Sequence, residues 1–332
     1  MRFNDNANLD TSRVEDGGGS GGGGGIGGSG IGLPHIAGGG IVGLIITIII
    51  VLMQSGFFGG TAQSVSGGLR TTSLEQSAAS FSGSSLSGSG RFDYSTCKTG
   101  RDANAHSECA LVAVENSLTN YWSNQPDVKD IWKPEAAIDV FHGAVSTNGC
   151  GAASTAAGPF YCPTANHQGT IYLDTQFYDT IFRQLGGDAT TFVQAYVIAH
   201  EYGHHIQDLR GQMAHQDGST GATSYSVHLE LQADCFAGMW TAAATTTTDS
   251  NGQPLITELT RQDIAEAINA THIVGDDYIE QKMGGAVDES QWTHGSSAER
   301  AAWFSAGMNA RNDINACDTF HASDLRDPSS IS

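Results

Sequence analysis

The spacing of apolar and polar residues divides the chain into one uniformly apolar run and a longer, patterned region. The run reads IAGGGIVGLIITIIIVLM over residues 36–53 and contains no charged side chain. As a helix it would be about 27 Å long, close to the thickness of the hydrocarbon core of a bilayer. Sequence rich in Gly and Ser flanks the run, whereas a core helix would be flanked by amphipathic elements. The pattern predicts one transmembrane helix over residues 36–58; a buried core helix or strand pair is the alternative.

Low-complexity sequence surrounds this predicted membrane helix. Residues 17–30 are nearly all glycine, and a glycine tract has nothing to bury, so we expect residues 1–35 to form a disordered tail. Residues 59–91 are rich in Ser and Gly, which predicts a flexible stalk. No basic region directly precedes the apolar run, which argues against a cleaved signal peptide. The globular domain is expected over residues 92–327, which is long enough for one hydrophobic core.

Within this globular region the periodicity alternates between helical and extended patterns. Leu111, Val114 and Leu118 recur at helical spacing, which predicts a helix over residues 107–125. A further helix is predicted over residues 176–185, with Asp174 or Thr175 as its cap. Short strands are predicted over residues 137–141, 159–162 and 170–173. The mixture indicates an α+β fold.

The segment TTFVQAYVIAHEYGHHIQDLRG, residues 190–211, carries the most informative pattern. Its first half is apolar on nearly every face, as expected of a helix in the middle of a domain. His200, Glu201 and His204 form an HExxH motif, and residues four apart lie on the same face of a helix. Both imidazoles can therefore bind one metal ion while Glu201 stays beside it to handle a bound water. The motif predicts one Zn²⁺ per chain, with His200 and His204 as ligands.

A zinc site with two histidines needs a third protein ligand. A His six residues after the second histidine is ruled out, because Arg210 occupies that position. Glu230 and Asp234 lie four residues apart in an apolar, Ala-rich segment. We expect Glu230 to bind zinc and Asp234 to accept the free N–H of a ligand imidazole, which would fix the orientation of that ring. The rival ligands in this part of the chain are His205, His215 and His228.

The charge balance excludes one class of partner. The chain has 15 Lys and Arg against 35 Asp and Glu, a formal net charge of −20 at pH 7. Nucleic-acid binding requires clustered basic residues to neutralise phosphates, so we expect no nucleic-acid partner. The expected partners are a peptide or protein substrate and, through one helix, membrane lipid. The oligomeric state is left open.

The cysteines bear on the compartment. All six follow the apolar run, and an even set suits an oxidising compartment. Proximity in the sequence predicts disulfides that pair Cys97 with Cys109, Cys150 with Cys162 and, as the remaining pair, Cys235 with Cys317. Other pairings and buried free thiols are the alternatives. We expect a single-pass protein of the cell membrane with a cytoplasmic N-terminus and an extracytoplasmic C-terminal catalytic domain.

Four motifs carry a resemblance to a known family. They are HEYGHHIQ, ELQADCFAGMW, GPFYCP followed by IYLD, and THGSSAER followed by WF. Together they resemble the bacterial neutral zinc metallopeptidase family over roughly residues 92–320. More remotely, HExxH followed by ExxxD is similar to thermolysin and to the CAAX-prenyl-protease-like membrane peptidases, the gluzincin group. The resemblance implies a zincin-like α+β domain with a small sheet and a peptidase activity, and it identifies no substrate.

The same resemblance implies roles for two further residues. In the CAAX-protease-like group, a Thr-His-Pro motif followed by an Arg six residues after the His lies near the metal. This chain has Thr-His-Gly at residues 293–295 and then Arg300 at the same offset, with Gly in place of Pro. By this resemblance His294 and Arg300 stabilise the oxyanion. Ser296 and Glu299 also fit a helix-capping box, on whose surface Arg300 would pair.

The resemblance also implies where substrate binds and what the protein does. Gluzincins hold extended substrate along an edge strand near zinc, so substrate would pair with Thr170, Ile171, Tyr172 and Leu173 of TIYLD, which forms a hairpin with GPFYC. A plain core strand is the alternative. We expect a membrane-anchored zinc metalloendopeptidase in which Glu201 is the general base for attack of water on a peptide bond. The alternative is a membrane-tethered zinc-binding interaction module without turnover.

Overall fold

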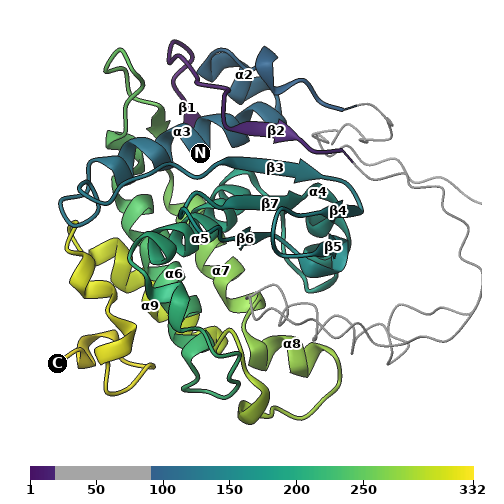
Figure 1. The fold of residues 1–332 in the computed structure, drawn as a ribbon, viewed down its shortest axis with the longest axis vertical. Helices are drawn as coiled ribbons and strands as arrows, with labels where there is room; N and C mark the ends of the chain where they lie inside the picture. The colour runs from purple at the N-terminus through teal and green to yellow at the C-terminus, as the bar shows by residue number, and fades with distance from the viewer. Residues whose placement is uncertain (19–90) are drawn as a thin grey trace, which may run out of the picture.

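The computed structural model describes residues 1–18 and 91–332, and in these ranges it shows the expected mixture of helices and small sheets (Figure 1). One sheet of four strands has the order β2-β3-β7-β6. Its strands are β2 (Val14–Asp16), β3 (Ala137–Phe141), β7 (Thr170–Asp174) and β6 (Phe160–Cys162). Strands β2, β3 and β7 run parallel, and β6 runs antiparallel to β7. The predicted strands over residues 137–141, 159–162 and 170–173 are therefore confirmed to within a residue or two.

Four helices form most of the core. They are α3 (Ser107–Ser123), α5 (Thr191–Leu209), α6 (Tyr225–Ala243) and α9 (Ser297–Asn309). Two of them, α3 and α5, contact this sheet. Helix α5 contacts β6 and β7 on one side and α6 on the other, and α6 packs along α9. The backbones of α6 and α9 touch at Gly238 and Gly307, where a Cβ atom would collide with the backbone of the other helix. These two glycines allow the close contact of α6 with α9.

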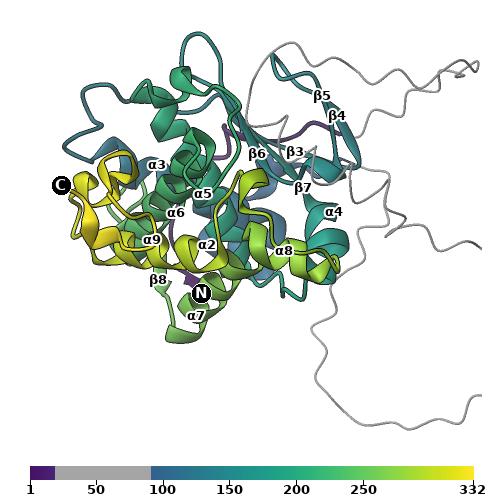
Figure 2. The same ribbon diagram turned by 90° about the horizontal axis from the view of Figure 1, so that it is seen from below.

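Shorter elements complete the fold. They include β1 (Arg2–Phe3), α2 (Gly100–Ala105), β4 (Ala144–Ser146), β5 (Ala152–Ser154), β8 (Ile256–Glu258), α7 (Arg261–Ile273) and α8 (Asp276–Lys282). The β4–β5 hairpin and the C-terminal elements lie at opposite ends of the domain in both views (Figure 1, Figure 2). The helix predicted over residues 176–185 begins as α4 (Thr175–Phe177), capped by Asp174, and continues as a π-helical turn, η3 (Tyr178–Phe182). Turns of this type are rare and often occur near functional sites.

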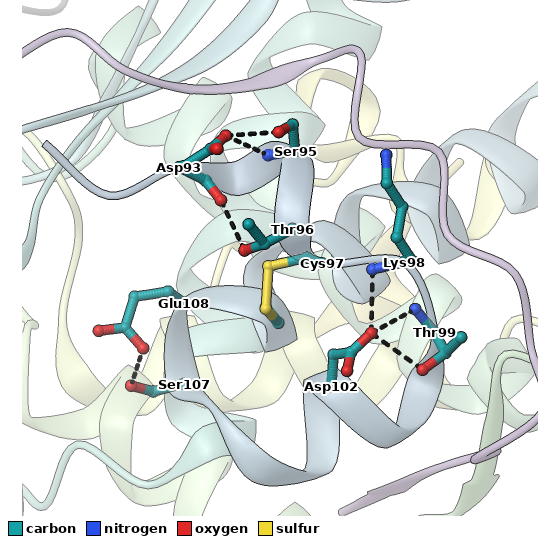
Figure 3. Close-up of a disulfide and its surroundings, with 10 residues drawn as sticks. Asp93, Ser95, Thr96, Cys97, Lys98, Thr99, Asp102, Ser107 and Glu108 are labelled. Carbon is teal, nitrogen blue, oxygen red and sulfur yellow. Dashed lines mark hydrogen bonds between the residues drawn. A yellow bond between two sulfur atoms is a disulfide. The ribbon is translucent and has the colours of Figure 1, made fainter.

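All three predicted disulfides are confirmed: Cys97–Cys109, Cys150–Cys162 and Cys235–Cys317. The first joins the end of η1 (Tyr94–Thr96) to the start of α3 (Figure 3). Beside it, the Asp102 carboxylate accepts hydrogen bonds from the backbone N–H groups of Lys98 and Thr99 and so caps α2. The third disulfide closes 82 residues and attaches the C-terminal region to α6.

The first 18 residues, here called the N-terminal arm, are part of the folded domain. Strand β2 pairs in parallel with β3, β1 pairs antiparallel with β8, and the Met1 ammonium lies 2.6 Å from Asp263 Oδ1. The prediction of a disordered tail over residues 1–35 is therefore wrong for the arm, and residues 19–35 lie outside the described residues. The prediction failed because the arm's few apolar side chains are scattered, whereas the adjacent glycine tract dominates the local pattern.

Arg13 ties the N-terminal arm to two buried carboxylates. Its Nε lies 2.6 Å from Glu115 Oε1 on α3 and 3.7 Å from Glu135 Oε1. Burial, and then the charge of Glu115, raise the pKa of Glu135 to about 8. The arm therefore supplies the positive charge that this buried pair requires.

The predicted transmembrane helix, residues 36–58, lies outside the described residues, as does nearly all of the predicted stalk, residues 59–91. Within the described ranges, no helix combines the length and apolar character needed to cross a membrane. A single crossing between residues 18 and 91 would put the N-terminal arm and the rest of the domain on opposite sides of a bilayer, where β2 could not pair with β3. The predicted arrangement, with a cytoplasmic N-terminus and an extracytoplasmic C-terminal domain, is therefore wrong.

Candidate metal centre

The predicted ligands lie on the two long helices at the centre of the domain. Thr190 caps α5 by accepting a hydrogen bond from the backbone N–H of Val193. Most apolar residues in the first turns of α5 are buried in the core. The two helices approach closely at Gly203, where a Cβ atom would lie 3.0 Å from the backbone of Ala233. This approach brings the HExxH face of α5 against the turn of α6 that carries Glu230.

His200, His204 and Glu230 form a compact cluster of possible metal ligands. One ligand atom from each lies within 4.8 Å of the others, and all three residues are buried. The Nε2 atoms of His200 and His204 lie 3.2 Å and 3.4 Å from the two carboxylate oxygens of Glu230. Two imidazole nitrogens and one carboxylate match the ligand set of a catalytic zinc site, so the residues fit Zn²⁺.

Asp234 lies where the sequence predicts, against the other ring nitrogen of His200. Its Oδ1 is 2.8 Å from His200 Nδ1 and accepts a hydrogen bond of 2.6 Å from the Tyr196 hydroxyl. Burial favours the neutral form of Asp234, but the charges of Arg300 and His200 outweigh it and lower the pKa to about 2. An ionised Asp234 holds the Nδ1 proton of His200 and leaves Nε2 to bind metal.

Gln207 does for His204 what Asp234 does for His200, and the sequence analysis missed it. The Oε1 atom of Gln207 lies 2.8 Å from His204 Nδ1, while its Nε2 donates to the backbone carbonyl of Leu229 at 2.7 Å. The side chain is fully buried between α5 and α6. Its spacing could have revealed it, because a residue three positions after His204 lies on the same helix face.

Glu201 is buried beside the ligands. Burial raises the pKa of its carboxyl, and the neighbouring imidazoles of His204 and His200 oppose that rise. The hydroxyl of Tyr178, in the π-helical turn, is buried without a hydrogen-bond partner in the described part of the chain. Burial and the charge of Glu201 both raise the pKa of Tyr178. No sequence signal points to Tyr178.

His294 is held by Asp276, a second residue that the sequence analysis missed. The Asp276 carboxylate lies 3.0 Å from His294 Nδ1 and accepts hydrogen bonds from the backbone N–H groups of residues 293–295. Gly295 has a φ of +85°, which proline cannot adopt, so the Gly in place of Pro has a physical reason. No local pattern relates Asp276 to His294, because they lie in different elements.

Arg300 lies behind the metal ligands. Its Nε and Nη2 bind the two oxygens of Asp234 at 2.7 Å and 3.1 Å, and its Nη1 donates to the carbonyl of Val274. Its charge is therefore committed to the carboxylate that orients His200. The predicted capping box of Ser296 and Glu299 is confirmed, but Arg300 is buried, so the alternative of surface pairing is wrong.

The rival ligands lie elsewhere. The Nε2 of His205 bonds the carbonyl of Lys133 at 2.8 Å, and the Nδ1 of His228 bonds the carbonyl of Thr319 at 2.8 Å. His215 ends the short helix η4 (Gln212–His215). None of the three belongs to the ligand cluster found among the described residues.

The proposed substrate strand requires a correction. Strand β7, with Thr170, Ile171, Tyr172 and Leu173, lies inside the sheet and pairs with β3 on one side and β6 on the other. It has no free edge, so the prediction that it pairs with substrate is wrong and the core-strand alternative holds. The predicted hairpin with GPFYC is confirmed, and β6 is the end strand of this sheet in the described part of the chain.

Proteins of known sequence resemble this chain over much of its length. The uncharacterized protein Mb2605 of Mycobacterium bovis is 43% identical over 236 residues, which cover 70% of this chain and 78% of that relative. The uncharacterized protein Rv2575 of Mycobacterium tuberculosis matches to the same extent. The uncharacterized protein YpfJ of Escherichia coli is 38% identical over 187 residues, or 54% of this chain and 60% of that relative. No solved structure matches the chain significantly.

A family model covers both the N-terminal arm and the metal-binding helices. It matches residues 1–320 and is described as putative neutral zinc metallopeptidase. The match spans most of the chain, including both histidines of the HExxH motif that lie in the ligand cluster. The chain therefore belongs to the family of putative neutral zinc metallopeptidases.

Proposed function

We propose that this protein is a zinc-dependent endopeptidase. The observation that carries the proposal is the buried cluster of His200, His204 and Glu230 with the Glu201 carboxylate beside it. When bound there, zinc supplies Lewis acidity, which polarises a peptide carbonyl and makes water more acidic. Attachment to a membrane through the apolar run, residues 36–53, is part of the proposal and rests on the sequence alone. The pairing of β2 with β3 requires both flanks of this run to lie on the same side of the membrane.

Each nearby side chain has a task in this mechanism. Glu201 takes the proton of the attacking water and delivers it to the leaving amine. His294 lines the same cavity as Glu201, and Asp276 fixes its Nδ1, so its Nε2 is available to donate to the oxyanion. Arg300 positions His200 through Asp234, because its guanidinium donates to the carboxylate that holds the Nδ1 of His200.

The test separates hydrolysis from metal binding. We expect the zinc-loaded full chain to cleave unstructured peptides and the Glu201→Gln variant to retain zinc while losing activity by about a hundredfold to ten-thousandfold. Metal content and peptide cleavage are measured on the same preparations. Zinc binding without cleavage in the parent protein would refute the proposal in favour of an interaction module. Full activity in metal-replete Glu201→Gln would refute the role of Glu201.

A further inference from the structure

An apolar cavity adjoins the candidate metal centre. Its volume is about 140 Å³, and it is lined by the site residues His200, Glu201, Glu230 and His294 together with side chains from four other segments. An apolar cavity of about 150 Å³ is large enough to hold benzene in other proteins. The cavity therefore has room for one aromatic or branched aliphatic side chain.

The walls of this cavity are apolar side chains that the protein leaves partly uncovered. Residues of this type are normally fully buried in a core, and a contiguous group that is not marks a binding surface. Six wall residues are only half-buried: Phe177, Ile181, Leu185, Val197, Val274 and Ile279. They come from α4, from the π-helical turn and the residues directly after it, from α5, and from the region of α8. An apolar ligand group would complete their burial.

The polar groups of the lining also bear on which side chain the cavity accepts. The carboxylates of Glu201 and Glu230 both line it. The one arginine in the lining, Arg300, already donates to both oxygens of Asp234. No unpaired arginine or lysine in the described lining remains to bind an acidic side chain, so a neutral apolar group fits best.

We propose that this cavity is the specificity pocket of the enzyme and binds the large apolar side chain, aromatic or branched aliphatic, of a residue that flanks the cleaved bond. The inference rests on the proposed peptidase function and goes beyond it by naming the substrate class. The cavity shares its lining with Glu201 and with two of the ligands, His200 and Glu230, so an occupant lies next to the reacting carbonyl. Phe, Leu, Ile and Met have suitable volumes.

The first experiment digests an unbiased peptide mixture with the zinc-loaded full chain and identifies the cleavage sites by mass spectrometry. We expect large apolar residues to be enriched at one position beside the cleaved bond, with kcat/KM about tenfold or more above that for Gly. Cleavage without this enrichment would overturn the pocket assignment and leave the peptidase proposal standing. No cleavage by zinc-loaded protein would overturn the peptidase proposal itself.

A second experiment tests the pocket without turnover. Calorimetry compares binding of phenylpropionyl hydroxamate with that of acetohydroxamate, which share a zinc-binding group and differ in the apolar part. The phenyl compound should bind at least about tenfold more tightly if the cavity takes its ring. Equal affinities would overturn the assignment even if peptides are cleaved.

Variants connect the preference to the cavity walls. Val197→Phe should fill the cavity, abolish the preference for large apolar residues and equalise the two hydroxamates. The matched control is Val287→Phe, the same change at a residue that is 43% exposed and not in the cavity lining. Ile279→Ala, on α8, should enlarge the cavity and shift the preference toward Trp. Zinc content is measured for each variant, and an unchanged preference in both wall variants would overturn the proposal.

Discussion

Two buried clusters of charged residues flank helix α5, and they differ in how their charges are satisfied. On one face, His200, His204 and Glu230 converge beside an apolar cavity, and their ligand atoms lie within 4.8 Å of one another. On another side, Glu115 and Glu135 are closed by Arg13 of the N-terminal arm. Tyr202, one residue after Glu201, faces this second cluster, with its hydroxyl 3.0 Å from Thr119 Oγ1 on α3.

This comparison distinguishes a cluster with a structural role from a cluster that can bind a metal. A buried charged cluster is stable only if its charges are paired or bind a metal. In the Arg13 cluster, a side chain of the protein supplies the counter-charge, and this ion pair holds the N-terminal arm against α3. The ring Nδ1 atoms of His200 and His204 are held by Asp234 and Gln207, and the opposite nitrogens point to Glu230 in an arrangement that fits a cation. An apolar cavity adjoins this cluster.

The largest expected effect is the loss of stability on removing Arg13 from its cluster with Glu115 and Glu135. Arg13→Ala should reduce the free energy of unfolding by about 3–5 kcal/mol, because the buried Glu115 carboxylate loses its counter-charge. Chemical denaturation measures the loss. Arg2→Ala, at an exposed position of the same arm, is the matched control and should change little. Equal stability of the Arg13 variant and the parent would mean that the arm is not fastened by this pair.

A slightly smaller effect, on catalysis, is expected from replacing His294 beside the candidate metal centre. His294→Ala should lower kcat by about a hundredfold to a thousandfold, as expected for loss of an oxyanion donor, while zinc content stays unchanged. Asp276→Asn should lower it less, because His294 remains present but is less well oriented. If KM rises and kcat is unchanged, His294 binds substrate in the ground state and does not stabilise the oxyanion.

Removing the hydrogen bond that orients the ring of His204 should have a moderate effect on zinc affinity. Gln207→Ala should weaken zinc binding by about tenfold to a hundredfold, because His204 loses the group that fixes its ring. Competition with a chelator of known affinity measures the change. Gln212→Ala, at the start of η4, is a control that removes the same functional group away from the site. Unchanged zinc affinity in the Gln207 variant would remove this residue from the metal centre.

The smallest expected effect is a pH dependence of the free energy of unfolding, which comes from Glu135 in the Arg13 cluster. The folded state raises the pKa of Glu135 from 4.5 to about 8, so between these values it binds more protons than the unfolded state. The free energy of unfolding should therefore fall as pH rises through this window, by at most about 1.4 kcal/mol per pH unit from this group. Glu135→Gln should make the dependence shallower. Denaturation of both proteins across the window provides the comparison, and identical slopes would contradict it.

Local spacing explains which parts of the site could be predicted. His200, Glu201 and His204 lie on one helix face through the helical period, and Glu230 with Asp234 obeys the same rule. Two disulfides could be predicted from proximity along the chain, and Cys235–Cys317 followed as the remaining pair. Asp276 could not be predicted because its contact with His294 joins separate elements.

Long-range pairing explains what could not be predicted in the fold. The strand β2 has three residues, and its partner β3 lies more than 100 residues away, so no local pattern marks the N-terminal arm as folded. The pattern of β7 identifies a strand but does not reveal its neighbours on both sides. Hydrophobic periodicity identifies elements, whereas their order in a sheet depends on contacts between distant segments.

The most direct test of the account is the zinc content of the purified full chain compared with that of His204→Ala. The cluster of His200, His204 and Glu230 predicts about one tightly bound zinc per parent chain. The variant should lose most of this zinc, because only two of the three protein ligands remain. Circular dichroism confirms that both proteins are folded. A folded parent chain that binds no zinc when the metal is supplied would contradict the central claim that this cluster is a metal centre.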